Sequence, residues 1–148
     1  YDTPCNLFVA GFIGSPQMNF LDAVCKVDGD KVFLEVGPAS IELTEAKAKK
    51  LIEGGYDGKK VVLGVRPEDV HDEEEFIAAS PNTVIESTIR VYEMLGAEVY
   101  LYFDYEGSSM TARVKPGTAA RTGDTVKFAL DAKKIHVFDK ETEVVITN

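Results

Sequence analysis

One stretch of the chain brings an imidazole and several carboxylates close together. His71 is flanked by Asp69, Asp72 and Glu73, and these side-chain types can hold a metal ion or exchange protons. Their spacing matches no established metal-binding pattern. An exposed acidic loop over residues 71–81 is the simpler interpretation, because Ala-Ala-Ser-Pro follows the acidic run and interrupts any strand pattern. We therefore predict no metal site and no catalytic residue here.

A second stretch has the composition of a phosphate-binding loop. Residues 54–60 read Gly-Gly-Tyr-Asp-Gly-Lys-Lys. A nucleotide-binding loop needs four residues between its glycines, so that backbone amides surround the phosphates, and a serine or threonine after the lysine to reach magnesium. Here three residues separate Gly54 from Gly58, and Lys60 takes the place of the hydroxyl. We predict the end of a helix followed by a turn.

An aromatic run offers a different kind of binding chemistry. Residues 100–105 alternate so that Phe103 and Tyr105 share one face of a strand, while Tyr100 and Tyr102 share the other. On an oligonucleotide/oligosaccharide-binding (OB) barrel, exposed aromatics such as these can stack on a sugar ring or a base. Cross-strand packing is the simpler explanation of these residues. With Arg113, they are the ligand-stacking candidates of an alternative function, a stand-alone barrel that binds an oligosaccharide or another small ligand.

The remaining reactive side chains indicate structure rather than catalysis. The sequence holds no Gly-x-Ser-x-Gly motif and no cysteine–histidine pairing. His136 lies between two apolar residues of an expected strand, where a structural role suffices. Cys5 and Cys25 form neither a metal-ligand spacing nor a disulfide framework, as expected in a reducing cytoplasm.

Short alternating apolar segments separated by Gly, Asp and Pro predict an all-β fold with minor α content, either a sandwich or a small barrel. Glycines in Asp28-Gly29-Asp30 and Glu106-Gly107-Ser108 suit hairpin turns. One helix stands out, with Thr44 as its cap and Gly54-Gly55 at its end. We expect strands over residues 19–27, 31–36, 60–66, 83–95, 98–105, 109–114, 125–130 and 135–138.

Composition narrows the class of function. The net charge of −9 opposes the neutralisation of phosphates, which disfavours a nucleic-acid partner. The apolar stretches are much shorter than the roughly 20 residues of a membrane span. The chain opens with Tyr-Asp-Thr-Pro, with neither an initiating Met nor a leader, and we expect that a further domain precedes it.

Several segments, in their order along the chain, resemble the C-terminal part of maltose-type carbohydrate-importer ATPases. They are Phe-Val-Ala-Gly-Phe-Ile-Gly-Ser-Pro-Gln-Met-Asn-Phe at 8–20, Leu-Gly-Val-Arg-Pro-Glu at 63–68, Val-Tyr-Glu-Met-Leu-Gly-Ala-Glu at 91–98, Gly-Asp-Thr-Val at 123–126 and Ile-His-Val-Phe-Asp at 135–139. The likeness covers nearly the whole chain. It implies an OB-like β-barrel of the transport-associated (TOBE) type with one short connecting helix.

The resemblance also implies a domain organisation. Residues 1–18 would be the linker from a missing upstream ATPase domain together with the first strand. Residues 19–148 would be the OB-like regulatory domain, either as one barrel or as two intertwined lobes with a boundary near residues 71–82.

By the same resemblance, the expected function is that of a regulatory and dimerisation domain in the ATP-binding subunit of a sugar importer. The chain lacks a Walker lysine motif and a Leu-Ser-Gly-Gly signature, so we expect no cofactor here, with ATP and magnesium bound only by the missing domain. Expected partners are a second copy, the ATPase domain and, through it, the membrane permease subunits and a regulatory protein, at the cytoplasmic face of the membrane. The regulatory or interface candidates are Phe12, Ile13, Phe20, Arg66, Glu68, Gly123 and Phe138.

Overall fold

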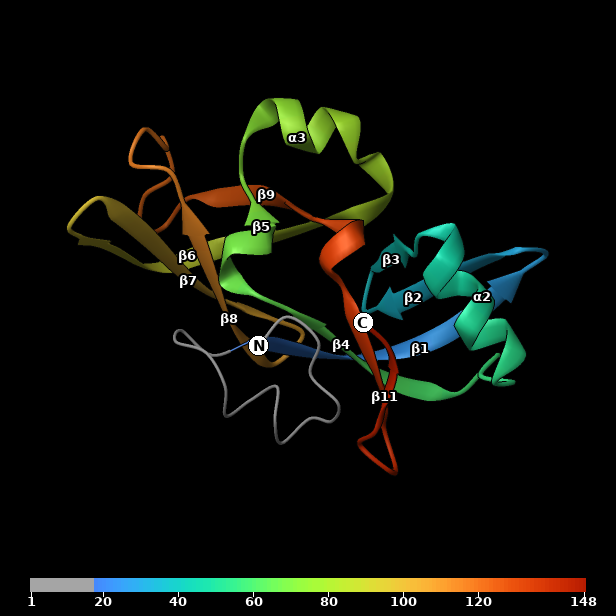
Figure 1. Cartoon of the computed structure of the whole chain (residues 1–148). Helices are drawn as coiled ribbons and strands as arrows, with labels where there is room; N and C mark the ends of the chain where they lie inside the picture. Colours follow the sequence, from blue (N-terminus) through green and yellow to red (C-terminus); the bar gives the residue numbers. More distant parts are fainter. Residues whose placement is uncertain (1–17) are drawn as a thin grey trace.

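Two antiparallel sheets make up the part of the chain that the computed structural model describes, residues 18–148 (Figure 1). The first sheet has the strand order β11–β10–β4–β1–β2–β3. Its strands are β1 (Asn19–Asp28), β2 (Lys31–Val36), β3 (Ala39–Glu42), β4 (Lys60–Val65), β10 (His136–Asp139) and β11 (Val145–Thr147).

The second sheet has the order β5–β9–β6–β7–β8 and curls into a nearly closed barrel, because its edge strands β5 and β8 contact each other. Its strands are β5 (Val70–His71), β6 (Val84–Leu95), β7 (Glu98–Tyr105), β8 (Ser108–Val114) and β9 (Thr125–Leu130). The mostly-β, OB-like fold class is therefore confirmed.

Within the described residues, two helices and three 3-10 turns connect the strands. They are α2 (Glu45–Glu53), α3 (Glu74–Ala79), η1 (Pro67–Asp69), η2 (Pro81–Thr83) and η3 (Ala132–Lys134). Helix α2 packs on β2 and β11, and α3 lies over β9 at the top of the view in Figure 1. Among residues 18–148, no helix combines the length and the apolar content required to cross a membrane.

One hydrophobic core serves both sheets. Leu21 and Leu63 of the first sheet belong to the same buried cluster as Phe103 and Phe128 of the second. The rings of Phe103 and Phe128 stack with their centroids 4.5 Å apart. Cys25 is a buried free thiol of this core, and burial, together with the charge of Asp57, raises its pKa to about 11.

The expected strands are confirmed to within about two residues at their ends, and α2 begins after Thr44 and ends at Gly54 as predicted. The Thr44 side chain makes no capping hydrogen bond, however. The expectation of a loop over residues 71–81 is wrong, because this segment holds the end of β5 and helix α3. Two glutamates in the first turn of α3 stabilise the helix because their charges interact favourably with the positive end of its dipole. The rings of Phe76 and His71 stack with their centroids 3.9 Å apart.

Candidate functional site

The side of β1, β4 and β10 that faces away from the core brings several predicted interface residues together. The strand pairing aligns Phe20 with Gly64 and Gly64 with His136. The rings of Phe20 and Phe138 meet edge to face, with their centroids 6.2 Å apart. Together with Met18, Val62 and Val145 they form a small apolar cluster separate from the main core, which we call the outer cluster.

Gly64 lies beneath the outer cluster because no larger residue fits there. A Cβ atom at this position would lie 2.8 Å from the Met18 sulfur and 3.0 Å from a Phe138 ring carbon. Contacts this short displace their neighbours. The glycine therefore lets both side chains pack directly on the backbone of β4.

A hydrogen-bonded polar chain of three side chains, Arg66, His136 and Asn148, continues this face beyond the outer cluster. Arg66 Nη1 lies 3.2 Å from His136 Nε2, and His136 Nδ1 lies 3.0 Å from Asn148 Oδ1. A guanidinium can only donate, so Nε2 accepts and Nδ1 carries the proton that it donates to Asn148. Arg66 and His136 are both buried. The structural role expected for His136 is consistent with this pairing.

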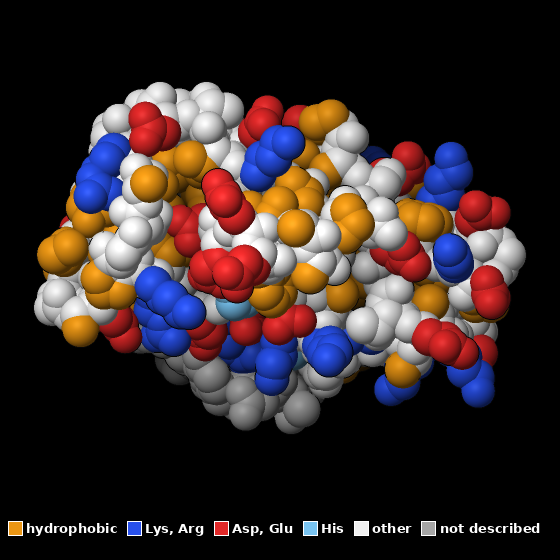
Figure 2. All heavy atoms as spheres, turned by 90° about the horizontal axis from the view of Figure 1, so that it is seen from above, with side chains coloured by type: hydrophobic (Ala, Val, Ile, Leu, Met, Phe, Trp, Pro, Cys, Tyr) orange, Lys and Arg blue, Asp and Glu red, His pale blue; other side chains and the backbone are white. Residues whose placement is uncertain are grey.

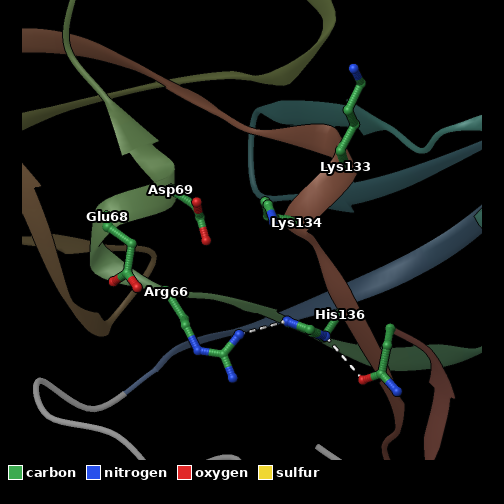
Figure 3. Close-up of a pocket in the computed structure, with 7 residues that line it drawn as sticks. Arg66, Glu68, Asp69, Lys133, Lys134 and His136 are labelled. Carbon is green, nitrogen blue, oxygen red and sulfur yellow. Dashed lines mark hydrogen bonds between the residues drawn. The ribbon is translucent and has the colours of Figure 1, made fainter. Parts of the chain in front are cut away.

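A cavity of about 300 Å³ adjoins the polar chain (Figure 3). Arg66 and Glu68 reach it from the end of β4 and from η1, while the two lysines come from η3. Its lining residues are Arg66, Glu68, Asp69, Lys133, Lys134, His136 and Asn148. The pocket thus mixes both signs of charge, and the predicted candidates Arg66 and Glu68 share it.

Asp69 is the most perturbed acid near this pocket. Burial raises its pKa to about 6, and the negative charges of Glu68 and Asp131 add to the effect. Lys134 and His71 act in the opposite direction. Asp131 is close because β5 pairs with β9, and the Asp131 N–H donates to the Asp69 carbonyl at 3.0 Å. In the folded chain, protonation of Asp69 is therefore favoured at mildly acidic pH.

Of the other predicted interface residues, Gly123 does not join this site. Phe12 and Ile13 lie outside the described residues. Gly123 belongs to a loop of the second sheet, where its N–H donates to the Ile89 carbonyl at 2.8 Å. Its φ of +91° is a conformation that glycine adopts without strain. The face seen from the side of α3 mixes acidic, basic and apolar side chains (Figure 2).

The ligand-stacking candidates Tyr100, Tyr102 and Arg113 lie together on β7 and β8. The two tyrosine rings are nearly parallel, with their centroids 6.5 Å apart. Their hydroxyls donate to Glu98 and Glu93, at 2.7 and 3.0 Å, and Arg113 lies 3.8 Å from Glu98. These contacts engage both hydroxyls within the sheet.

The glycine–lysine segment is the end of a helix and a turn, as predicted. Gly54 is the C-cap of α2, and Gly55 and Gly58 adopt positive φ values of 70° and 78°. The Tyr56 hydroxyl between them donates to Asp139 at 2.8 Å. This segment therefore joins α2 to the first sheet.

Sequence reasoning missed four residues of the site, namely Asp131, Lys133, Lys134 and Asn148. No motif marks them. They reach the site only through the pairing of β5 with β9 and of β10 with β11. Strand β5 has two residues, too few for an alternating pattern to appear, so the register that sets Asp131 beside Asp69 had no signal in the sequence.

Comparisons with known protein families agree with this architecture. A family model described as the MalK OB fold domain matches residues 14–70, and one described as the TOBE domain matches residues 63–138. The cytoplasmic molybdate-binding protein ModG, in a crystal structure with molybdate bound, superposes with a TM-score of 0.60 at 15% identity. The match covers 85% of this chain and 97% of that one, and at this identity it shows the fold alone.

Curated relatives are similar over almost the full length of the chain. The oligosaccharides import ATP-binding protein MsmX of Bacillus subtilis is 41% identical over 146 residues, which are 99% of this chain and 39% of the relative. The trehalose/maltose import ATP-binding protein MalK of Thermococcus litoralis is 38% identical, with 96% and 38% covered. The multiple sugar-binding transport ATP-binding protein MsmK of Streptococcus mutans is 36% identical, with 99% and 38% covered. The chain thus spans about two fifths of the length of these relatives.

Proposed function

The chain belongs to the TOBE domain family, and on that basis we propose that it is the regulatory and dimerisation domain of the ATP-binding subunit of a sugar importer. The observation that carries this proposal is the alignment of 99% of the chain, at 41% identity, with one such subunit. ATP and magnesium would bind to the part of the subunit that this chain does not include. The chain itself would turn over no ATP. The whole subunit would work at the cytoplasmic side of the membrane with permease subunits.

Regulation of this kind requires a surface that differs between the open and closed forms of the ATPase dimer. A regulator with equal affinity for both forms would shift neither. The face formed by the outer cluster and the neighbouring Arg66 and Glu68 is our candidate. It combines the partly buried Phe20 with the partly exposed Glu68, next to the buried Arg66, and such a patch can contact its own copy across a two-fold axis. A second copy, or a regulatory protein, would bind there.

Sedimentation equilibrium over a range of chain concentrations tests dimerisation. We expect a dimer that dissociates on dilution, and Glu68→Lys should weaken association by roughly tenfold, because it reverses the charge of a partly exposed residue on this face. Glu74→Lys is the matched control, since Glu74 is an exposed residue on α3. A monomer at every concentration, or equal effects of the two variants, would contradict this assignment of the dimer face.

Titration calorimetry separates the proposal from its rivals. We expect no saturable heat with ATP, and tight ATP binding by this chain would overturn the regulatory proposal. Saturable heat with maltodextrins that is lost in Tyr102→Ala would instead favour the stand-alone oligosaccharide-binding barrel.

A further inference from the structure

We propose that Asp69, His71 and Asp131 form a binding site for a divalent transition-metal cation. The site is independent of the proposed regulatory function. It also departs from the expectation of an acidic loop without metal, and it adds Asp131, which is distant in the sequence and directly follows β9, the strand paired with β5. Asp72, which is next to His71 in the sequence, does not belong to the group of ligand atoms that lie within 4.8 Å of one another, and its carboxylate accepts a hydrogen bond from the Thr118 hydroxyl.

The fold holds these three side chains at one place. Asp69 ends η1, and His71 lies two residues later on β5, so the chain brings the two residues close together. Strand β5 pairs with β9 through Val70 and Leu130, and Asp131 directly follows β9. The backbone bond from Asp131 to Asp69, 3.0 Å long, fixes the spacing.

The distances fit an ion between the three groups better than direct contacts among them. One ligand atom from each residue lies within 4.8 Å of the other two. His71 nevertheless forms no ion pair with either aspartate, and its Nδ1 lies 3.3 Å from Glu73 Oε2 instead. Ligand atoms around a tetrahedral ion with bonds of about 2.1 Å lie roughly 3.4 Å apart. Closing the site around an ion therefore needs only a modest contraction.

Among the described residues, the carboxylates of this cluster form no close ion pair with a lysine or arginine, although the charge of Lys134 acts on Asp69 from a longer distance. Within residues 18–148, no lysine or arginine nitrogen lies within 4.0 Å of either aspartate side chain, and no donor hydrogen-bonds to the Asp69 carboxylate. Asp131 accepts one bond, from the Lys133 N–H at 3.1 Å, through Oδ1, which leaves its second oxygen available. Two half-buried carboxylates close to each other cost free energy because their negative charges repel. A cation between them would offset that cost.

The His71 ring is held in place by two neighbouring side chains. Its Nδ1 lies 3.3 Å from Glu73 Oε2, and its ring stacks on Phe76. A carboxylate on one ring nitrogen fixes the tautomer that leaves the other nitrogen with a free lone pair, the usual arrangement around metal-binding histidines. One imidazole with two carboxylates favours zinc, manganese or cobalt over calcium and magnesium, which prefer oxygen ligands. The adjoining cavity of about 300 Å³, lined in part by Asp69, has room for water ligands.

Titration calorimetry of the EDTA-treated chain with ZnCl₂, MnCl₂ and MgCl₂ tests the site. We expect one saturable site for zinc or manganese and weaker binding of magnesium. His71→Asn and Asp131→Asn should each weaken binding by roughly tenfold or more. An asparagine at position 131 can still accept the Lys133 bond, so this variant should keep its fold. Glu75→Gln, an exposed neighbour on α3, is the matched control and should bind like the parent chain.

A second readout separates loss of the site from loss of the fold. Without metal, Asp131→Asn should be as stable as the parent chain or more stable, because it removes a repelling charge. Added zinc should raise the melting temperature of the parent chain and leave that of the variant unchanged. Absence of saturable binding, or equal binding by the parent chain, His71→Asn and Asp131→Asn, would overturn the proposal, and neither result would affect the dimerisation assay.

Discussion

The side-chain amide of Asn19 pairs with the backbone of Thr111 in the way that a neighbouring strand would. Its Nδ2 donates to the Thr111 carbonyl and its Oδ1 accepts from the Thr111 N–H, both at 2.8 Å. Asn19 begins β1 in the first sheet, whereas Thr111 lies on β8, an edge strand of the second. One side chain thus satisfies two backbone groups of an open edge and joins the two sheets.

Replacing Asn19 with Ala should lower the free energy of unfolding by about 1–3 kcal/mol, because both partner groups on Thr111 lose their bonds in a part-buried position. Urea unfolding measures the loss. Asn82→Ala is the control, since Asn82 makes one exposed hydrogen bond, to Glu42, and it should cost less than about 0.5 kcal/mol. Equal losses in the two variants would show that the Asn19 pairing contributes nothing beyond an exposed contact.

Replacing Gly64 with Ala should destabilise the chain by about 1–3 kcal/mol, because the new methyl group meets Phe138 and Met18 at 3.0 and 2.8 Å. Gly64→Val should cost more. Gly117→Ala is the matched control, since a Cβ at Gly117 meets no atom within 4 Å. That variant should be neutral or slightly stabilising. A neutral Gly64→Ala in thermal unfolding would mean that the outer cluster can shift freely.

The stability of the metal-free chain should depend on pH through Asp69. Its folded pKa of about 6 lies above its ordinary value of 3.8, so the folded chain binds more protons than the unfolded chain between these values. Stability therefore rises as pH falls from about 7 to about 4. Asp69→Asn should remove this component and gain about 1–2 kcal/mol at pH 7, after allowance for solvent screening of a half-exposed group.

Urea unfolding of the parent chain and Asp69→Asn at pH 5 and pH 7, with EDTA present, measures the difference. The difference in the free energy of unfolding between the two proteins should be larger at pH 7 than at pH 5. Asp72→Asn is not a suitable comparison because Asp72 is bonded to Thr118. Glu75→Gln is the control instead, and it should change the free energy of unfolding at neither pH. A gap that is the same at both pH values would argue against a raised pKa at Asp69.

Lys47 should be required to hold the C-terminal strand. Its buried ammonium donates to the Ile135 carbonyl at 2.8 Å and to the Asn148 backbone oxygen, and burial lowers its pKa. Lys47→Met keeps the apolar stem but leaves these carbonyls unpaired, at a cost of about 1–3 kcal/mol. Faster amide exchange in β11 should accompany the loss. Lys49→Met, at an exposed position of the same helix, should change neither quantity.

The strands were predictable from sequence where each had enough residues to alternate. The runs that became β1 and β7 place every second side chain in the core, as in Leu21, Ala23 and Cys25, and this pattern carries the period of a strand. Strands β3, β5 and β11 have four, two and three residues, too few for a period. Helix α3 was missed for a related reason, because its acidic first turn has the composition of a loop.

The candidate site was predictable only in part. Arg66, Glu68, Phe20 and Phe138 all stand in segments that carry the family resemblance, and it was this resemblance that made them candidates. That these residues share one face depends on β10 returning to pair with β4, and local sequence does not encode such a long-range pairing. The same limit hid Asp131 from the group of Asp69 and His71.

The return of β10 to β4 also determines the order in which the chain can mature. During synthesis β1 to β4 leave the ribosome first, yet one side of β4 has no partner until residues 136–139 have followed. Until then the growing chain displays an apolar strand with an open edge, the kind of template that recruits other chains. Translation speed across the second sheet, and any chaperone that shields β4 meanwhile, should therefore influence the yield of native protein.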